Sequence, residues 1–258
     1  MASSYAQPRT GQPSAAAEVA AALHDGKTHL LLAASGSVAT IKIPLIAAAF
    51  SKVPNLSIRV ILTPNAAQFL QGQADEQPRY DSESLKGLPN VDAVYVGDAD
   101  EWNPSWTRGA PILHIELRRW ADLLVVAPLS ANLLAKITNG LCDSLLTSVI
   151  RAWETDPAVG KRILVAPSMN TAMWNHPLTA RQLSTLRDSW GVGRLTETST
   201  EEGEPQEENR GWYEVLLPQS KSLACGDVGQ GGMMDWRDIV VTIRERLSLS
   251  PEYFETST

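Results

Sequence analysis

Short apolar runs recur along the chain, and helix-like patterns separate most of them. A run of about five apolar residues without polar alternation is typical of a strand that is covered on both faces. The runs lie at residues 29–34, 57–62, 123–127 and 163–166, with weaker ones at 93–96 and 213–217. Helical patterns lie at residues 39–52, 65–70, 131–153, 178–190 and 236–247.

The alternation of strand and helix predicts an α/β domain with a parallel sheet. Right-handed crossover connections place helices on both faces of such a sheet. Ligands of open parallel sheets bind at the carboxyl ends of the strands. The residues that follow the predicted strands are therefore candidates for a binding site.

Length and composition favour one domain with a real core, because 43% of the 258 residues are hydrophobic. Residues 1–26, rich in Ser, Gln, Pro and Ala, are expected to form a disordered tail, and the domain is expected to span residues 27–249. Residues 250–258 are expected to be a C-terminal tail. The Glu-rich residues 197–209 predict an acidic surface loop.

Charge and cysteine content exclude several classes of protein. Lys and Arg total 22 against 29 Asp and Glu, and this excess of negative charge disfavours a nucleic-acid partner. Cys142 and Cys225 are too few for a disulfide framework and lack the spacing of a zinc site, which favours a reducing cytoplasm and no metal. Cys142, beside an apolar helical run, is expected in the core. No apolar run reaches the length of a membrane helix.

The first predicted strand runs into the sequence Ser35-Gly36-Ser37-Val38-Ala39. Glycine permits a tight turn, and backbone N–H groups at the following helix start can hold a phosphate. The same residues also fit an ordinary capped turn between a strand and a helix. Because neither the three-glycine dinucleotide fingerprint nor a Walker lysine is present, a mononucleotide phosphate is the better hypothesis.

Two later strands also end in small polar residues. Ser130 and Asn132 follow the third main strand, and Asn170 follows the fourth within the sequence Pro167-Ser168-Met169-Asn170. Each of these side chains could cap a helix or bond to a flat heterocycle. Two strand ends that flank one crevice favour a shared ligand site.

His114 and Cys225 are the side chains with the clearest capacity for proton transfer. His114 lies at the predicted start of a helix that leads into the third main strand, where it is either a structural or a catalytic residue. Cys225 is followed closely by four glycines, which indicate a mobile flap. A thiol on such a flap fits a proton donor or a nucleophile better than a core residue.

Together, the motifs at residues 35–39, 128–132, 167–174 and 224–227, with the His114 helix, resemble the phosphopantothenoylcysteine decarboxylases, which are flavin-dependent cysteine decarboxylases. The resemblance implies a three-layer flavodoxin-like (Rossmann-type) fold, bound FMN, and a cytoplasmic homotrimer whose active sites lie between subunits. It also implies a lyase of coenzyme A biosynthesis that converts 4′-phosphopantothenoylcysteine to 4′-phosphopantetheine and CO₂ through a thioaldehyde and an enethiolate. Residues 71–108 and 197–209 depart from the family as insertions.

The resemblance further implies roles for individual residues. His114 would assist thiol oxidation as a base, Asn170 would bind the substrate carboxylate or amide, and Cys225 would protonate the enethiolate. Met173 would contact the substrate, and Arg119 and Lys42 are candidates for contact with its phosphate or with another subunit. The residues that would hold FMN are Gly36, Ser37, Val38, Thr63, Ser130, Ala131, Asn132, Leu133, Ser168 and Met169.

Three other functions are compatible with parts of this pattern. A peptidyl-cysteine decarboxylase would stop at the enethiol, and a flavin prenyltransferase would use the same crevice differently. Some relatives act instead as regulatory subunits that inhibit a protein phosphatase. The presence of Cys225 favours the coenzyme A enzyme over the peptide enzyme, and the full set of His114, Asn170 and Cys225 favours an enzyme over a regulator.

Overall fold

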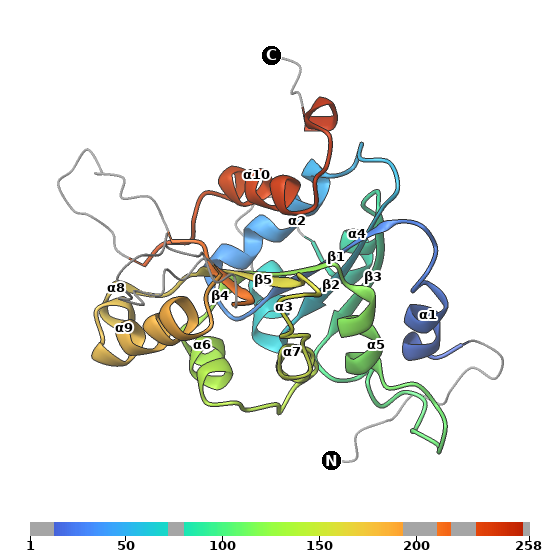
Figure 1. The fold of residues 1–258 in the computed structure, drawn as a ribbon, viewed down its shortest axis with the longest axis horizontal. Helices are drawn as coiled ribbons and strands as arrows, with labels where there is room; N and C mark the ends of the chain where they lie inside the picture. Colours follow the sequence, from blue (N-terminus) through green and yellow to red (C-terminus); the bar gives the residue numbers. More distant parts are fainter. Residues whose placement is uncertain (1–12, 72–79, 193–210, 218–230, 255–258) are drawn as a thin grey trace, which may run out of the picture.

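Six strands form a parallel sheet at the centre of the protein (Figure 1). The structure is a computed structural model that describes residues 13–71, 80–192, 211–217 and 231–254. The strand order is β3-β2-β1-β4-β5-β6. The strands are β1 (Thr28–Ala34), β2 (Leu56–Leu62), β3 (Val91–Val96), β4 (Leu123–Leu129), β5 (Arg162–Pro167) and β6 (Tyr213–Val215).

The central strands are apolar along their length because both of their faces are covered. In β1, Leu31 and Ala33 belong to one hydrophobic core, whereas Leu30 and Leu32 belong to the other. All four side chains are fully buried. This arrangement explains why the sequence shows continuous apolar runs rather than alternation.

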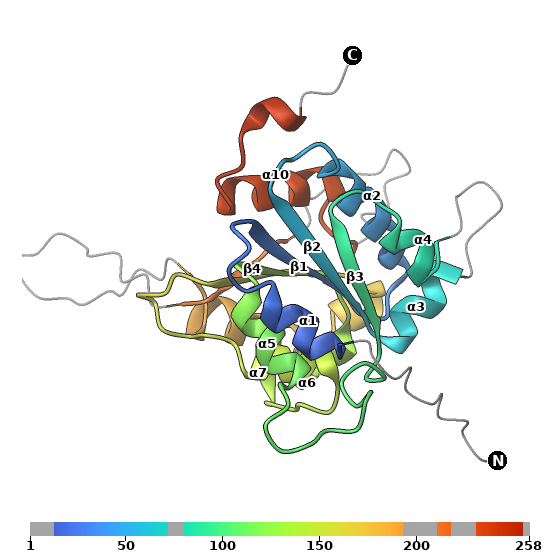
Figure 2. The same cartoon turned by 90° about the vertical axis from the view of Figure 1, so that its right-hand side faces the viewer.

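Helices cover both faces of the sheet, as Figures 1 and 2 show. This three-layer arrangement confirms the fold class expected from the sequence. One layer packs on the core that contains Leu30 and comprises η1 (Val38–Lys42), α2 (Ile43–Ala49), α3 (Pro64–Gln71), α4 (Ser82–Lys86) and α10 (Trp236–Arg246). The opposite layer comprises α1 (Ala15–Ala21), α5 (Leu113–Trp120), α6 (Ala131–Thr138), α7 (Leu145–Arg151), α9 (Pro177–Ser184) and η2 (Thr185–Ser189).

The strand order creates a crevice between β1 and β4. From β1 the chain moves outward through β2 to β3, and it then returns to place β4 on the other side of β1. The connections after β1 and β4 therefore diverge toward opposite layers, which opens a space at the carboxyl ends of these two strands. Such a switch point is the usual ligand site of a doubly wound sheet.

The expectation of a disordered tail through residue 26 is wrong for helix α1. Ser14 caps this helix by accepting a hydrogen bond from the backbone N–H of Ala17 at 3.2 Å. Ala16 and Val19, three positions apart, are buried against the core beside α5. The domain therefore begins before residue 27, although residues 1–12 lie outside the described part of the chain.

Two smaller expectations also need correction. In the proposed C-terminal tail, the short helix η3 (Pro251–Phe254) packs on the domain, and the ring of Phe254 meets that of Phe50 edge to face at 5.3 Å. Cys142 is exposed rather than buried. Gly140, with a φ of 72°, follows α6 and lets the chain turn outward before α7 begins. The acidic loop at 197–209 lies outside the described residues.

Candidate functional site

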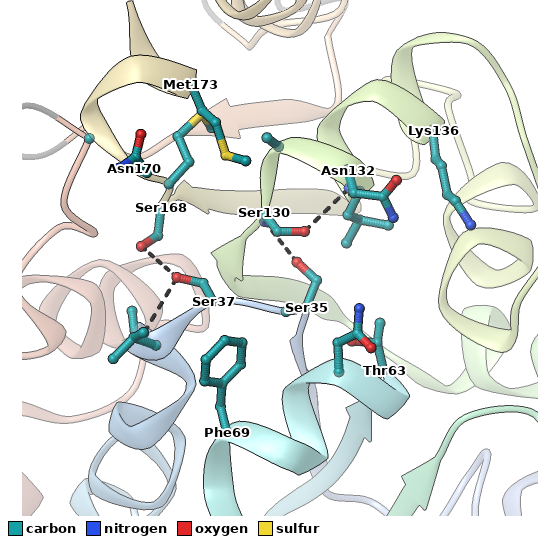
Figure 3. Close-up of a pocket in the computed structure, with 18 of the residues that line it drawn as sticks. Ser35, Ser37, Thr63, Phe69, Ser130, Asn132, Lys136, Ser168, Asn170 and Met173 are labelled. Atoms are coloured by element: carbon teal, nitrogen blue, oxygen red, sulfur yellow. Dashed lines mark hydrogen bonds between the residues drawn. The ribbon is translucent and has the colours of Figure 1, made fainter. Parts of the chain in front are cut away.

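A cavity of about 710 Å³ opens at the carboxyl edge of the sheet (Figure 3). It lies at the switch point, because its walls come from the segments that follow β1, β2, β4 and β5. All ten residues that the sequence suggested for FMN line it, and so do Asn170 and Met173. The structure therefore brings together in one place the motifs that follow four separate strands.

Ser35 joins the ends of β1 and β4. Its buried hydroxyl donates a hydrogen bond to the carbonyl of Pro128 at 3.0 Å and accepts one from the backbone N–H of Ser130 at 2.8 Å. The hydroxyl of Ser130 in turn accepts a hydrogen bond from the backbone N–H of Leu133 at 3.3 Å, which caps α6. Ser35 is thus a structural residue of the cavity floor.

Ser37 and Ser168 link the first and fourth of these segments. Their hydroxyl oxygens lie 2.9 Å apart, and Ser37 also caps η1 by accepting from the backbone N–H of Ala39 at 3.4 Å. A hydroxyl has one hydrogen to donate and two acceptor positions, so both serines keep hydrogen-bonding capacity for a ligand. The cavity therefore has a polar floor of hydroxyls and helix-terminal N–H groups, which suits a phosphate.

Gly36 is required where β1 turns into η1. A Cβ atom at this position would lie 2.7 Å from the Cβ of Asn65, which follows β2. Real Cβ atoms do not approach so closely, so a larger residue would have to push the two cavity walls apart. The glycine therefore allows close packing of the phosphate-binding turn against the next wall.

The described lining residues of the cavity include no negative charge that would repel an anion. Among the described lining residues, Lys136 is the one charged side chain, and no carboxylate faces the space. The Lys136 ammonium lies 2.6 Å from Asp143, and this hydrogen bond lowers the pKa of the Asp143 carboxyl. The Lys136 charge is therefore held at the edge of the cavity by a partner outside it.

The remaining walls fit a flat heterocycle. Phe69, Val38 and Met173 expose apolar surface at the cavity. The side-chain amides of Asn65 and Asn132 also line the space, and neither makes a hydrogen bond within the described ranges. Flavin mononucleotide combines a phosphate with a flat ring that carries carbonyls and ring nitrogens. The donor set of this cavity fits that combination.

Asn170 serves as a helix cap and lines the cavity at the same time. Its side-chain oxygen accepts a hydrogen bond from the backbone N–H of Ala172 at 2.8 Å, which starts α8 (Thr171–Trp174). The sequence left open whether this residue was a cap or a ligand contact, and its position permits both. With its oxygen engaged in the cap, its NH₂ group remains available to donate to a ligand.

Gly231 forms part of the wall beside Met169. Its carbonyl accepts a hydrogen bond from the backbone N–H of Met169 at 2.9 Å. Its φ is 96°, and a Cβ here would lie 2.5 Å from the Met169 carbonyl oxygen. The chain is thus anchored to the cavity shortly after the segment that carries Cys225. Cys225 itself lies outside the described residues.

His114, Arg119 and Lys42 do not line the cavity. His114 is near the start of α5, where its Nδ1 atom lies 2.6 Å from a carboxylate oxygen of Glu101. Arg119, in the last turn of the same helix, pairs with Glu116 at 3.0 Å, and Lys42 ends η1. The structure therefore separates these three residues from the ten that the sequence grouped around FMN.

Several lining residues were not singled out from the sequence. Asn65 follows the end of β2 by three positions, as Asn132 follows the end of β4, so the rule of strand ends could have identified it. Lys136 is one helical turn beyond Asn132 on α6, and this spacing was the available signal. Phe69 and Ser144 carried no such signal.

Within the described ranges, no cluster of three or more His, Cys, Asp or Glu residues could hold a metal ion. None of the helices in these ranges is long and apolar enough to cross a membrane.

Comparison with known proteins gives two kinds of relative. The flavoprotein family model matches residues 18–248. A mouse phosphopantothenoylcysteine decarboxylase is 37% identical over 92% of this chain and 96% of its own length. A protein of Schizosaccharomyces pombe described as a probable thymidylate synthase is 43% identical over 88% of this chain, but the chain spans only 30% of that protein.

Solved structures agree in sequence and in fold. A cysteine-to-serine variant of phosphopantothenoylcysteine decarboxylase, complexed with pantothenoylaminoethenethiol, is 39% identical with a TM-score of 0.61, over 85% of this chain and 97% of that one. The FMN-binding protein AtHal3 is 40% identical with a TM-score of 0.62, over 85% of this chain and 96% of its own. The chain therefore belongs to the flavoprotein family and, within it, to the phosphopantothenoylcysteine decarboxylases.

Proposed function

We propose that this protein is an FMN-dependent lyase that decarboxylates 4′-phosphopantothenoylcysteine to 4′-phosphopantetheine in coenzyme A biosynthesis. The observation that carries the proposal is the cavity at the switch point, where hydroxyls, helix-terminal N–H groups and two free amides converge with no carboxylate among the described lining residues. The mouse relative has the same activity in its name and matches nearly end to end. Because the substrate is a free thiol, we place the reaction in the reducing cytoplasm.

Residues of the cavity would hold FMN by its two chemically distinct ends. The turn at residues 36–39, with the hydroxyls of Ser37 and Ser168, would bind the phosphate. The ring would lie against Met169, with Asn132 available to bond its polar edge. When bound, FMN supplies the two-electron acceptor that oxidises the thiol, so that the carboxylate stands β to a C=S bond and can leave as CO₂.

Asn170 would orient the substrate for loss of CO₂. Its oxygen is fixed by the cap of α8, and its NH₂ group can donate to the substrate carboxylate or amide. Because the backbone N–H of Ala172 already holds the Asn170 side chain, this donor can fix the angle of the breaking bond with little further loss of conformational entropy on binding. Met173, exposed at the cavity, would cover the substrate from the same short helix.

The proton transfers would be made by His114 and Cys225. His114 would take the thiol proton at the start of the reaction, and Cys225 would return a proton to the enethiolate carbon at its end. The solved cysteine-to-serine decarboxylase variant holds an enethiol. A bound enethiol in that variant is the species expected when CO₂ has left and the final proton has not been delivered.

A second copy of the chain would complete the site. Among the described lining residues none is a histidine or a carboxylate, so the cavity lacks a base of its own, while His114 lies elsewhere on the same protomer. Trp102, Trp106 and Ile112 are exposed on the segment that leads to His114. An apolar surface of this kind beside a required side chain fits a subunit contact, and we propose a homotrimer with shared sites.

The proposal is tested by the spectrum and the products of the purified protein. We expect a yellow protein that releases about one FMN per chain on denaturation. It should convert 4′-phosphopantothenoylcysteine to fully reduced 4′-phosphopantetheine, which contains two hydrogens more than the corresponding enethiol. A peptide ending in cysteine serves as the control substrate and should not react. A colourless protein that FMN cannot reconstitute would contradict the proposal. A protein that decarboxylates the peptide but not 4′-phosphopantothenoylcysteine would also contradict it.

A further inference from the structure

Glu101 reaches His114 with both oxygens of its carboxylate. Oε1 lies 2.6 Å from Nδ1 of the imidazole, and Oε2 accepts a hydrogen bond from the backbone N–H of His114 at 3.1 Å. The Glu101 side chain is only 6% exposed. Its own backbone N–H is bonded to the carbonyl of Asp98 at 3.2 Å, so the residue is held from both sides.

The start of α5 depends on this contact. Ile112 occupies the N-cap position and makes no side-chain hydrogen bond there. The first N–H groups of a helix have no partner within the helix, and a carboxylate is favoured at this end by the helix dipole. Glu101 supplies both the missing acceptor and the negative charge from an earlier part of the chain. The hydrogen bond from the backbone N–H of His114 to Oε2 therefore fixes the position of Oε1 beside the imidazole.

The second oxygen determines which imidazole nitrogen carries the proton. An ionised carboxylate can only accept hydrogen bonds, so Nδ1 must be the nitrogen that bears hydrogen. In the neutral ring Nε2 then has the free lone pair. Nε2 makes no hydrogen bond within the described part of the chain, and the His114 side chain is 26% exposed. It can therefore accept a proton from outside its own protomer.

We infer that Glu101 is a positioning residue for the decarboxylation, which holds His114 in the Nδ1–H tautomer so that Nε2 is the proton acceptor. The inference rests on the proposed function, in which His114 is the base. Glu101 also stabilises the imidazolium that forms when Nε2 takes the proton, because its charge lies beside the opposite nitrogen. Glu101 touches neither cofactor nor substrate and acts only through His114.

The tautomer of His114 in the wild-type protein is the primary test. We would label the protein with ¹⁵N-histidine and assign the signals of residue 114 by their loss in the His114→Asn variant. The spectra would be recorded at a pH at which the imidazole ring is neutral. We expect a protonated Nδ1 and an unprotonated Nε2. The opposite tautomer would overturn the inference without any change at Glu101.

Glu101→Gln is the informative variant. Glutamine has one acceptor oxygen and one NH₂ group, so it cannot accept from both the backbone N–H and Nδ1–H. If its oxygen keeps the backbone contact, its NH₂ faces Nδ1 and selects the Nε2–H tautomer. We expect a shift toward this tautomer and a fall in kcat of about 10- to 100-fold, with KM and FMN content little changed. Unchanged kcat together with an unchanged tautomer would overturn the inference.

Glu154→Gln is the matched control. Arg118 belongs to α5, as His114 does, and the Glu154 carboxylate lies 3.4 Å from its guanidinium. The Glu154→Gln variant therefore also removes a carboxylate that contacts α5. It should leave both the His114 signals and kcat unchanged. The tautomer and the activity distinguish a failure of the proposed function from a failure of this inference. An inactive wild-type protein with the expected tautomer contradicts the proposed function but not the effect of Glu101 on His114. An active protein with the opposite tautomer contradicts the effect of Glu101 alone.

Discussion

The hydroxyl oxygens of Ser37 and Ser168 lie 2.9 Å apart, although 131 positions separate the two residues in the chain. This contact closes the polar floor of the cavity, because Ser37 follows β1 and Ser168 follows β5, with β4 between these strands. Ser35 makes a second link, from β1 to the end of β4. Ser35 and Ser37 therefore have different roles, in stability and in the cavity, and the difference can be measured.

Ser35→Ala should destabilise the protein more than Ser37→Ala. The first variant leaves the buried N–H of Ser130 without its partner, which costs about 2 kcal/mol of unfolding free energy. The carbonyl of Pro128 loses one of two hydrogen bonds and keeps the one from the backbone N–H of Ser35 at 3.1 Å. Ser37→Ala removes contacts that are only partly buried, so it should cost less stability but weaken FMN binding. Urea denaturation of the apoproteins and FMN titration measure the two effects. Equal losses of stability would contradict the structural role of Ser35.

Gly36→Ala should impair FMN binding, and Asn65→Gly should partly restore it. The added Cβ would lie 2.7 Å from the Cβ of Asn65, so the phosphate-binding turn must move. Removal of the Asn65 side chain in the double variant removes that contact, although it also loses one amide of the cavity. FMN affinity of the two single variants and the double variant measures the coupling. Additive losses in the double variant would show that the two positions do not compete for the same space.

The sequence predicted the sheet and the cavity because both follow from short-range patterns. Buried strands are visible as apolar runs, and the carboxyl ends of parallel strands must meet at one edge, so Ser130 and Ser168 could be placed together without knowledge of the strand order. Helix α1 was missed because its short Ala-rich sequence resembles a disordered tail. Its stability comes from the burial of Ala16 and Val19, which is a tertiary effect.

The sequence placed His114 correctly at the start of a helix that leads into β4, but its relation to the cavity could not be predicted in this way. Its helix precedes β4 rather than following a strand of the cavity, and the site that we propose would use His114 of a second protomer. Glu101 was missed for a related reason. It lies in a polar, turn-rich segment where acidic residues are common, and only the folded structure shows its carboxylate buried against His114.

Asp100→Asn should stabilise the protein by an amount that increases with pH. Burial raises the pKa of the Asp100 carboxyl above its ordinary value of 3.8, and the charge of Lys86 opposes this only in part. Between 3.8 and the raised pKa the native state binds the proton more strongly than the unfolded state, so the contribution of Asp100 to stability falls as the pH rises. Urea denaturation should show little difference below pH 3.8 and a constant gain for the variant near neutrality. A gain that is independent of pH would contradict this account.

A mixture of His114→Asn and Cys225→Ser chains should form the reduced product, 4′-phosphopantetheine, at a rate that neither variant reaches alone. If His114 of one subunit serves the cavity of another, some mixed sites contain both intact residues. Differently tagged chains should be mixed under conditions that exchange subunits, and the hybrid oligomers should be isolated and assayed. Each variant carried through the same procedure alone is the control. Hybrids that form without any activity would indicate that each site uses residues of one chain.

Cys225→Ser and His114→Asn should interrupt the reaction at different stages. Oxidation of the thiol and loss of CO₂ precede the protonation proposed for Cys225, so Cys225→Ser should still release CO₂ and accumulate the enethiol, which is lighter than the normal product by two hydrogens. A hydroxyl is a much weaker acid than a thiol, so this variant should form the reduced product about 10²- to 10⁴-fold more slowly. His114→Asn should bind FMN but release little CO₂, because it lacks the base for the first step. Mass spectra of the products together with CO₂ release distinguish the two. Normal product from Cys225→Ser at a near-normal rate would exclude the thiol as the acid, and Asp227 would become the next residue to test.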